Sequence, residues 1–174
     1  TRCVASVADP VRTLMFADDI MLYLSHASAH AINITLSAAV SAVARLLDAK
    51  GLILNTGKTQ VLAIKAGRQA HLDLHITCTG TPLAQTSTAR YLGVTLDENL
   101  RWSPQVTSIV RRTAMKLRIL RQIRHCLTVR QAMLYYSALV IPDILYASNA
   151  FLPGLSAEQR NTVAKLDKRC IRCV

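Results

Sequence analysis

The chain has 174 residues, a length typical of a single domain with one hydrophobic core. Apolar residues make up 51% of it and charged residues 18%, a composition that excludes a disordered segment. Five cysteines without a regular spacing exclude a secreted module held together by disulfides and indicate a reducing, intracellular compartment. Because the first residue is Thr1 rather than Met, we expect the chain to be a piece of a longer protein.

The net charge of +11 is distributed unevenly along the chain. Residues 1–98 contain 8 basic and 7 acidic side chains, whereas residues 99–174 contain 13 basic and 3 acidic ones. No acidic residue occurs between Glu98 and Asp143. Such an excess of one sign favours binding to a polyanion such as nucleic acid, and an enzyme acting on an acidic substrate remains an alternative.

Two apolar stretches are long enough to be candidate membrane helices. Residues 20–44 carry no formal charge but contain several Ser, His, Asn and Thr side chains. The stretch from Ala132 to Leu152 is interrupted near its centre by Pro142 and Asp143. Neither pattern is typical of a lipid-spanning segment, so we predict no membrane partner.

The first half of the chain predicts short strands around one helix. Two apolar runs flank Asp18 and Asp19, which predicts a β-hairpin with both carboxylates in its turn. From Ala29 to Lys50 apolar residues recur at helical spacing, and Gly51 follows as a natural C-cap. Four further strands are predicted at residues 52–55, 59–65, 72–76 and 90–96.

Helices are predicted throughout the second half. Ser103 followed by Pro104 is a start signal, with Ser as the N-cap and Pro at the first helical position. On the helix over residues 104–125 one side is apolar, and the opposite side carries arginines, namely Arg111 and Arg118 with Arg112 and Arg121 on the flanks. Two further helical runs cover 128–150, interrupted near Pro142, and 156–173. The predicted fold class is α+β: a mixed part over residues 1–97, then an all-helical basic part over 98–174.

The adjacent carboxylates of Asp18 and Asp19 are candidate metal ligands. Two carboxylates at the tip of an apolar hairpin repel each other unless a cation lies between them. Mg²⁺ prefers carboxylate oxygens and keeps coordination positions for water and phosphates. Acidic pairs in turns are also commonly only solvated, so these residues by themselves leave both interpretations open.

Three motifs together resemble the reverse transcriptase family. Phe16-Ala17-Asp18-Asp19-Ile20 resembles motif C of reverse transcriptases. Gly51-Leu52-x-Leu54-Asn55-x-x-Lys58-Thr59 resembles motif D of the non-LTR (LINE-like, jockey-type) retrotransposon enzymes. Tyr91-Leu92-Gly93-Val94-x-Leu96-Asp97 resembles their motif E, the primer grip, and Leu100-x-Trp102 resembles the start of their thumb. The motifs follow the family's order and spacing over essentially the whole chain.

The resemblance implies a partial polymerase palm of β-hairpins and a helix over residues 1–97, and an all-helical thumb over 98–174. It implies that Asp18 and Asp19 help bind two Mg²⁺ ions for nucleotide addition, with Asp18 as the direct ligand. Lys58 matches a lysine near the leaving pyrophosphate; without that context it is an ordinary solvated lysine. Tyr91, Leu92 and Gly93 would support the 3′ end of the primer, and their plain alternative is a strand with a glycine bulge.

The implied partners are an RNA template, a DNA primer and a deoxynucleoside triphosphate, in the cytoplasm and nucleus of a cell. The template–primer duplex would be held through its phosphates by the basic helix, with Arg111, Arg112, Arg118 and Arg121 as the contact residues. Their alternative is a solubilising helix face, although a purely solvating face normally mixes both signs of charge.

The main departure from the family's pattern concerns the metal site. Two Mg²⁺ ions need a further aspartate, from motif A, which this chain does not contain, so we expect the chain by itself not to polymerise. The alternatives are a non-catalytic nucleic-acid-binding remnant of a decayed element and a translated fragment that does not fold stably, because its hairpin lacks sheet neighbours. Gln105 stands where the family often has His.

Overall fold

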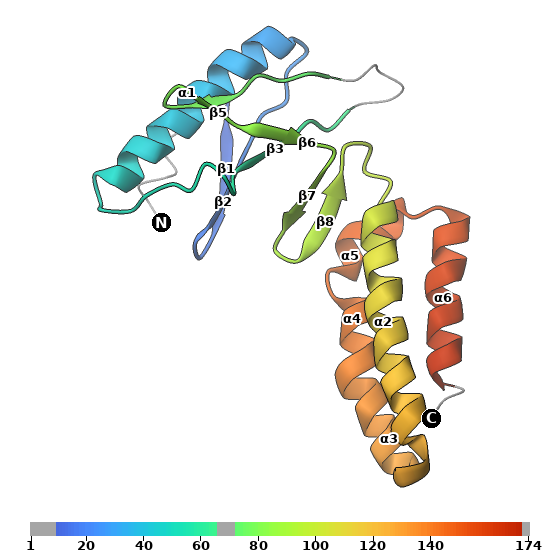
Figure 1. Ribbon diagram of the computed structural model, residues 1–174. Helices are drawn as coiled ribbons and strands as arrows, with labels where there is room; N and C mark the ends of the chain where they lie inside the picture. The colour runs from blue at the N-terminus through green and yellow to red at the C-terminus, as the bar shows by residue number, and fades with distance from the viewer. Residues whose placement is uncertain (1–9, 66–71, 172–174) are drawn as a thin grey trace. The chain divides into compact units, whose positions relative to one another are not determined.

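A computed structural model of the chain describes residues 10–65 and 72–171 (Figure 1). The chain forms two compact units, Thr1–Leu92 and Gly93–Val174, and each is described here by itself. The mixture of strands and helices confirms the α+β class. We expected a domain boundary after residue 97, which is the end of strand β8 (Val94–Asp97). In the structure the second unit begins at Gly93, so it contains β8.

The first unit begins with the predicted hairpin. Strand β1 (Arg12–Phe16) pairs antiparallel with β2 (Asp19–Tyr23), and Phe16 lies opposite Asp19. The turn is therefore Ala17-Asp18, one residue earlier than predicted, because Asp19 already belongs to the second strand. Since side chains alternate along a strand, the hairpin has two different faces. Thr13, Met15, Ile20 and Leu22 form the half-buried face, and Arg12, Leu14, Phe16, Asp19 and Tyr23 lie exposed on the other.

Helix α1 (Ala29–Asp48) follows and ends as its sequence predicts. At its start, the Ser28 hydroxyl accepts a hydrogen bond from the backbone nitrogen of Ala31 at 3.4 Å. At its end, Gly51 has a φ of +73°, and the Leu52 nitrogen donates to the Leu47 carbonyl at 2.9 Å. This is the Schellman arrangement, which needs a left-handed residue after the helix, and glycine supplies it without strain.

Side chains replace a neighbouring strand along residues 72–79. On one edge, the side chains of Asn33, Ser37 and Ser41 in α1 accept hydrogen bonds from the backbone nitrogens of His75, Thr77 and Thr79, respectively, at 3.0, 3.0 and 2.9 Å. On the other edge, the Gln85 amide accepts from the Leu74 nitrogen and donates to the Leu72 carbonyl, both at 2.7 Å. The strand predicted at 72–76 is therefore extended chain, and the regular ladder is confined to β4 (Thr77–Cys78) with β5 (Thr81–Pro82).

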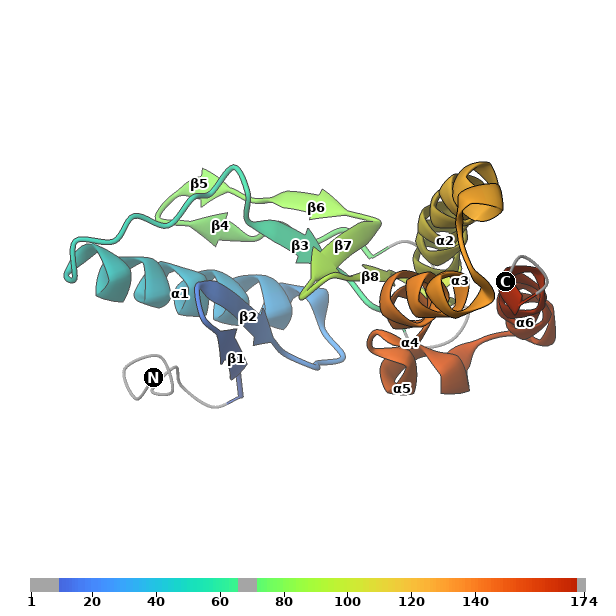
Figure 2. The same cartoon turned by 90° about the horizontal axis from the view of Figure 1, so that it is seen from below.

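The remaining strands of this unit are short. Strand β3 (Gln60–Leu62) pairs in parallel with β6 (Ala84–Thr86). Residues 52–55, predicted as a strand, form none in the described structure. Figure 2 shows α1 running alongside β4 and β5, and its contacts with β2 and β4 hold it there. The core beneath α1 consists of Val40, Val61, Ala63, Leu74, Ile76, Cys78 and Leu83.

By length and mean hydropathy, α1 is the one helix in the described ranges that could cross a membrane. A single helix that passes this test is weak evidence, because helices packed in a core pass it too. Here three polar side chains of α1 bind the backbone of the neighbouring extended segment, which is the behaviour of a helix packed on a sheet.

The first unit ends with β7 (Thr88–Tyr91), and the chain turns before β8 through Leu92 and Gly93, whose φ angles are +46° and +79°. Positive φ at two consecutive residues is typical of the type I′ turn of a tight hairpin. The single strand predicted over 90–96 was wrong for this reason: the glycine lies in a turn.

The second unit is helical after β8. Its long helix α2 (Ser103–Ile123) begins one residue earlier than predicted, because Trp102, with φ of +63°, occupies the N-cap position expected for Ser103. The predicted interruption near Pro142 is confirmed. The chain from Val129 contains α3 (Val129–Tyr135), a π-helical turn (Tyr136–Val140), α4 (Ile141–Leu145) and α5 (Ser148–Phe151). Two short 3₁₀ turns (Arg124–Cys126 and Leu152–Gly154) and helix α6 (Ala157–Ile171) complete it.

The start of α2 is fixed by Asp97, a function that the sequence analysis did not assign. The Asp97 carboxylate is 8% exposed and accepts hydrogen bonds from the backbone nitrogens of Arg101 and Trp102 at 3.0 and 2.8 Å. Trp102 then packs against Phe151, with ring centroids 6.4 Å apart. Both residues belong to the matched motifs, and both have a structural function here. Asp97 fixes the loop before α2, and Trp102 packs in the core of the second unit.

Candidate active site and nucleic-acid interface

The two carboxylates of the hairpin lie open to solvent. Asp18 occupies the second position of the turn, and Asp19 begins β2 opposite Phe16. In the described parts of the chain no cation pairs with either side chain. The turn also contains Ala17 at a φ of +54°, a conformation that costs a non-glycine residue roughly 1–2 kcal/mol. Such a turn holds two adjacent negative charges without neutralising them.

The donor chemistry of this pair fits a hard divalent cation. Mg²⁺ is usually bound through one or two carboxylates, with waters and substrate phosphates in the other positions. Within residues 10–65 and 72–171, no group of three or more His, Cys, Asp or Glu side chains is placed to hold a metal. The described donors therefore suffice for one loosely held ion, and a two-metal site requires additional carboxylate oxygens.

Lys58 lies on a turn that Asn55 builds. The Asn55 side-chain oxygen accepts a hydrogen bond from the Lys58 nitrogen at 3.1 Å, and its backbone carbonyl accepts from Thr59 at 3.1 Å. The turn thus fixes the backbone of Lys58 while its side chain is exposed. Among the described residues, no ion pair joins Lys58 to Asp18 or Asp19. The role of Lys58 near the leaving pyrophosphate stays a prediction.

The proposed primer-grip residues lie at the β7–β8 turn. Tyr91 ends β7, and Leu92 and Gly93 form the turn itself. A side chain at position 93 would combine the unfavourable φ of +79° with a contact of 3.3 Å to the Tyr146 ring. The motif therefore has a conformational reason for its glycine, whether or not it contacts nucleic acid.

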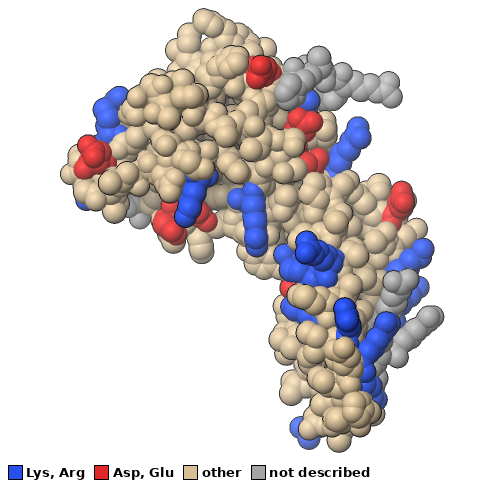
Figure 3. Space-filling view, viewed as in Figure 1, with Lys and Arg blue, Asp and Glu red and all other residues tan. Residues whose placement is uncertain are grey.

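The arginines of α2 divide into exposed and half-buried groups. Arg111 and Arg118 are exposed on the side opposite the buried Ile109 and Leu117, as predicted from helical spacing, and Arg121 is also exposed. On the visible face in Figure 3, the helical unit shows several Lys and Arg side chains and few acidic ones. Arg112 differs, because its side chain is 33% exposed and faces an acidic residue of α4.

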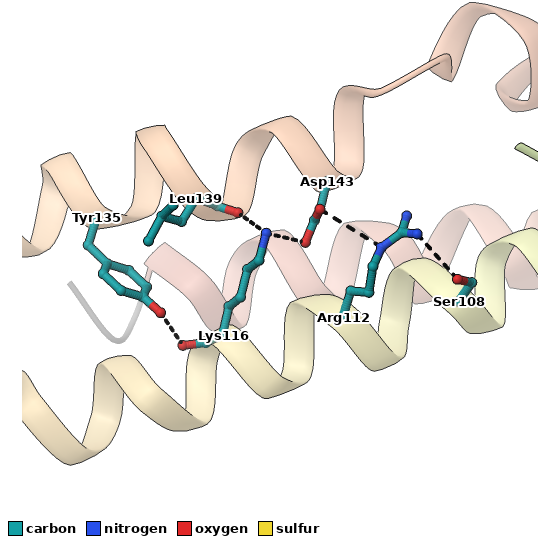
Figure 4. A network of polar contacts seen from close by, with 6 residues as sticks. All are labelled: Ser108, Arg112, Lys116, Tyr135, Leu139 and Asp143. Carbon is teal, nitrogen blue, oxygen red and sulfur yellow. Dashed lines mark hydrogen bonds and ion pairs between the residues drawn. The ribbon is translucent and has the colours of Figure 1, made fainter. Parts of the chain in front are cut away.

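That acidic residue is Asp143, at the centre of a polar network (Figure 4). Its side chain is 18% exposed and lies 2.7 Å from the Lys116 ammonium and 3.8 Å from the Arg112 guanidinium. Lys116 also donates to the Leu139 carbonyl at 2.7 Å, and the Tyr135 hydroxyl donates to the Lys116 carbonyl at 3.0 Å. The sequence analysis missed this network. The available signal was Asp143 itself, an isolated acid in a long basic stretch.

The chain is similar to a "Probable RNA-directed DNA polymerase from transposon BS" of Drosophila melanogaster, with 27% identity over 174 residues, 97% of this chain. The match covers 19% of that relative, so the chain spans about a fifth of the length of the curated protein it matches. No family model and no solved structure matches.

This similarity extends along nearly the whole chain, and the three motifs lie between Phe16 and Asp97. It supports the broader part of the resemblance, a reverse transcriptase from a transposable element.

Proposed function

We propose that the chain is the C-terminal palm and thumb portion of a non-LTR retrotransposon RNA-directed DNA polymerase. The observation that carries the proposal is the β1–β2 hairpin, whose tip presents Asp18 and Asp19 exposed and without an ion pair to any described Lys, Arg or His side chain. The similarity to the Drosophila polymerase supports it. A purely binding protein gains nothing from two such carboxylates next to a phosphate backbone, because they repel it.

In this proposal, Asp18 and Asp19 hold Mg²⁺, with Asp18 as the direct ligand. When bound in the intact enzyme, Mg²⁺ lowers the pKa of the primer 3′-hydroxyl and stabilises the leaving pyrophosphate. Lys58, held on its turn by Asn55, places a positive charge and a proton donor near that pyrophosphate. Tyr91, at the end of β7, and the turn residues Leu92 and Gly93 position the 3′ end of the primer.

The helical unit acts as the thumb. Arg111, Arg118 and Arg121 contact the phosphates of the RNA template and DNA primer, a mode of binding that does not depend on base sequence. Exposed arginines on the outer side of a long helix fit this task, because they reach the backbone of a duplex without disturbing the helical core. Arg112, expected from the sequence to join them, is half-buried and faces Asp143 instead.

The metal site is tested on the chain itself with Mn²⁺ as a paramagnetic probe. Titration of the ¹⁵N-labelled chain should broaden the amide signals around Asp18 and Asp19 at low Mn²⁺ concentration, and excess Mg²⁺ should reverse the broadening. The double variant D18N/D19N should lose this effect, whereas D48N, which removes an exposed carboxylate at the end of α1, should keep it. Equal broadening in D18N/D19N and in the unmodified chain would contradict the proposal.

A second candidate function is nucleic-acid binding without catalysis, as in the remnant of a decayed element. It is favoured by the excess of basic side chains in residues 99–174, which contain 13 basic and 3 acidic ones. This alternative predicts salt-dependent binding of an RNA–DNA duplex together with no Mn²⁺ effect at the hairpin. The same titration therefore separates the two functions.

A further inference from the structure

Helix α2 presents its cations in two directions. Arg111 and Arg118 are two helical turns apart and exposed. Arg112 and Lys116 are one turn apart on a different flank, and their side chains are 33% and 29% exposed. All four residues contribute equally to the net charge, but only Arg111 and Arg118 are exposed to solvent.

The second pair is held by one carboxylate. Asp143 approaches Lys116 to 2.7 Å and Arg112 to 3.8 Å, so a single negative charge faces two positive ones in a half-buried setting. Screening by water is weaker here than for exposed pairs, so the attraction is stronger than that of a surface salt bridge.

Each cation has a second restraint. The Lys116 ammonium also donates to the Leu139 carbonyl at 2.7 Å, and the Arg112 Nη1 lies 3.4 Å from the Ser108 hydroxyl. The Tyr135 hydroxyl in turn donates to the Lys116 carbonyl. Figure 4 shows both long side chains directed from α2 toward Asp143. These contacts hold the two side chains in one direction, toward the packed helices.

We propose that Asp143 keeps Arg112 and Lys116 from binding nucleic-acid phosphates and so limits the affinity of the thumb for a duplex. The proposal rests on the proposed function, in which the helical unit binds nucleic acid. A phosphate is the same class of anion as the carboxylate it must displace, and both compete for the same two cations. A smaller number of phosphate contacts lowers both the affinity for the duplex and the dependence of that affinity on salt.

The test is the salt dependence of duplex binding. The chain and its variants are titrated onto a fluorescent 20-base-pair DNA duplex at several salt concentrations, and anisotropy gives log K against log salt. Each phosphate contact contributes about 0.9 to the slope. D143N should therefore steepen the slope by up to about 1.8 and raise affinity most at low salt. An unchanged slope in folded D143N would overturn the proposal.

The control separates new contacts from a general change of net charge. E158Q removes one exposed carboxylate from the same unit, in the first turn of α6, without touching the cations of α2. It should raise affinity slightly and leave the slope unchanged. If E158Q steepens the slope as much as D143N does, the effect is long-range and the proposal is wrong.

A third variant tests the same idea without an unpaired buried charge. R112Q/K116Q/D143N removes both cations and their carboxylate together, and circular dichroism shows whether each variant is folded at the assay temperature. Because neither cation contacts phosphate in the unmodified chain, the triple variant should keep the original slope even if D143N unfolds. A decrease of about 1.8 would overturn the proposal.

The same measurements distinguish a failure of the proposed function from a failure of the role proposed for Asp143. If the unmodified chain does not bind the duplex, or if R111Q/R118Q binds as well as the unmodified chain, nucleic-acid binding by this face is wrong. If R111Q/R118Q weakens binding and D143N leaves the slope unchanged, the role of Asp143 alone is wrong.

Discussion

The hydroxyl of Ser37 accepts a hydrogen bond from the backbone nitrogen of Thr77, 3.0 Å away. Asn33 and Ser41 repeat this contact one helical turn to each side. Four residues of helix rise about 6 Å, and two residues of strand rise about 6.6 Å, so a helix and an extended segment can match at every turn. Helix α1 thus satisfies a row of backbone donors that would otherwise face outward from a sheet edge.

The first prediction concerns this row. S37A leaves the Thr77 amide without its partner in a half-buried position, which should cost about 1–3 kcal/mol locally. Hydrogen exchange measured by NMR should show faster exchange at Thr77, with smaller effects at the amides on either side. S25A, at an exposed residue before α1, is the matched control and should leave exchange at Thr77 unchanged. Equal protection in S37A would show that the hydroxyl contributes nothing.

The second prediction concerns the loop before α2. In D97N the amide nitrogen faces a backbone donor, so one of the two hydrogen bonds to Arg101 and Trp102 is lost in a buried setting. We expect the second unit to lose about 1.5–3 kcal/mol. Trp102 is the single tryptophan, so its fluorescence reports unfolding of this unit. N99A, at an exposed loop residue, should leave the transition in place.

The third prediction concerns Gly154. A Cβ at this position would lie 2.5 Å from the indole nitrogen of Trp102, and the ring cannot yield because it packs on Phe151. G154A should therefore destabilise the second unit by about 1–3 kcal/mol. The measurement is the midpoint of the tryptophan transition in urea. G57A, where the added carbon meets only the Asn55 side chain at 3.4 Å, should not shift that midpoint.

The fourth prediction concerns the exposed arginines. R111Q/R118Q should weaken binding to a DNA duplex and reduce the slope of log K against log salt by about 1.8, since two phosphate contacts are removed. Anisotropy titrations measure both quantities. R130Q, at an exposed arginine of α3, serves as the charge control. A loss in R130Q equal to half that of the double variant would indicate diffuse attraction rather than contacts of this face.

The fifth prediction concerns catalysis. Since the described residues offer no third metal-binding carboxylate near Asp18 and Asp19, the purified chain should not extend a DNA primer on an RNA template with Mg²⁺ and deoxynucleotides. Incorporation above background that disappears in D18N/D19N would show that the two carboxylates suffice. Incorporation that persists in D18N/D19N would indicate a contaminating polymerase.

Elements with a local signal were predictable from the sequence. The hairpin follows from its two apolar runs, α1 from its helical spacing and Gly51, and the break in the second helical run from Pro142. The exact turn of the hairpin was not predictable, because Ala17 adopts a positive φ that alanine rarely takes. The turn therefore moved by one residue, and Asp19 moved from the turn into β2.

Features that depend on residues distant in the sequence could not be predicted. Side chains of α1 and of Gln85 form hydrogen bonds to both edges of the extended segment around Leu74. The alternation of apolar and polar residues, from which a strand was predicted there, does not indicate such partners. The pairing of Lys116 with Asp143 is of the same kind, because it depends on how α4 packs against α2. At the site, the positions of Asp18, Lys58 and Arg118 on exposed turns or faces agree with the sequence, and their roles stay predictions.

The π-helical turn Tyr136–Val140 determines which side chains of this helical stretch face α2. Eight residues along a regular α-helix, as from Tyr135 to Asp143, would point about 80° apart. A π turn contains one additional residue, which brings the separation close to two whole turns and directs both side chains toward Lys116. A chain shorter by Ala138 would therefore restore a regular helix in which Tyr135 and Asp143 still share a side. The additional residue of the π turn is therefore what places Tyr135 and Asp143 on the same side of this helical stretch.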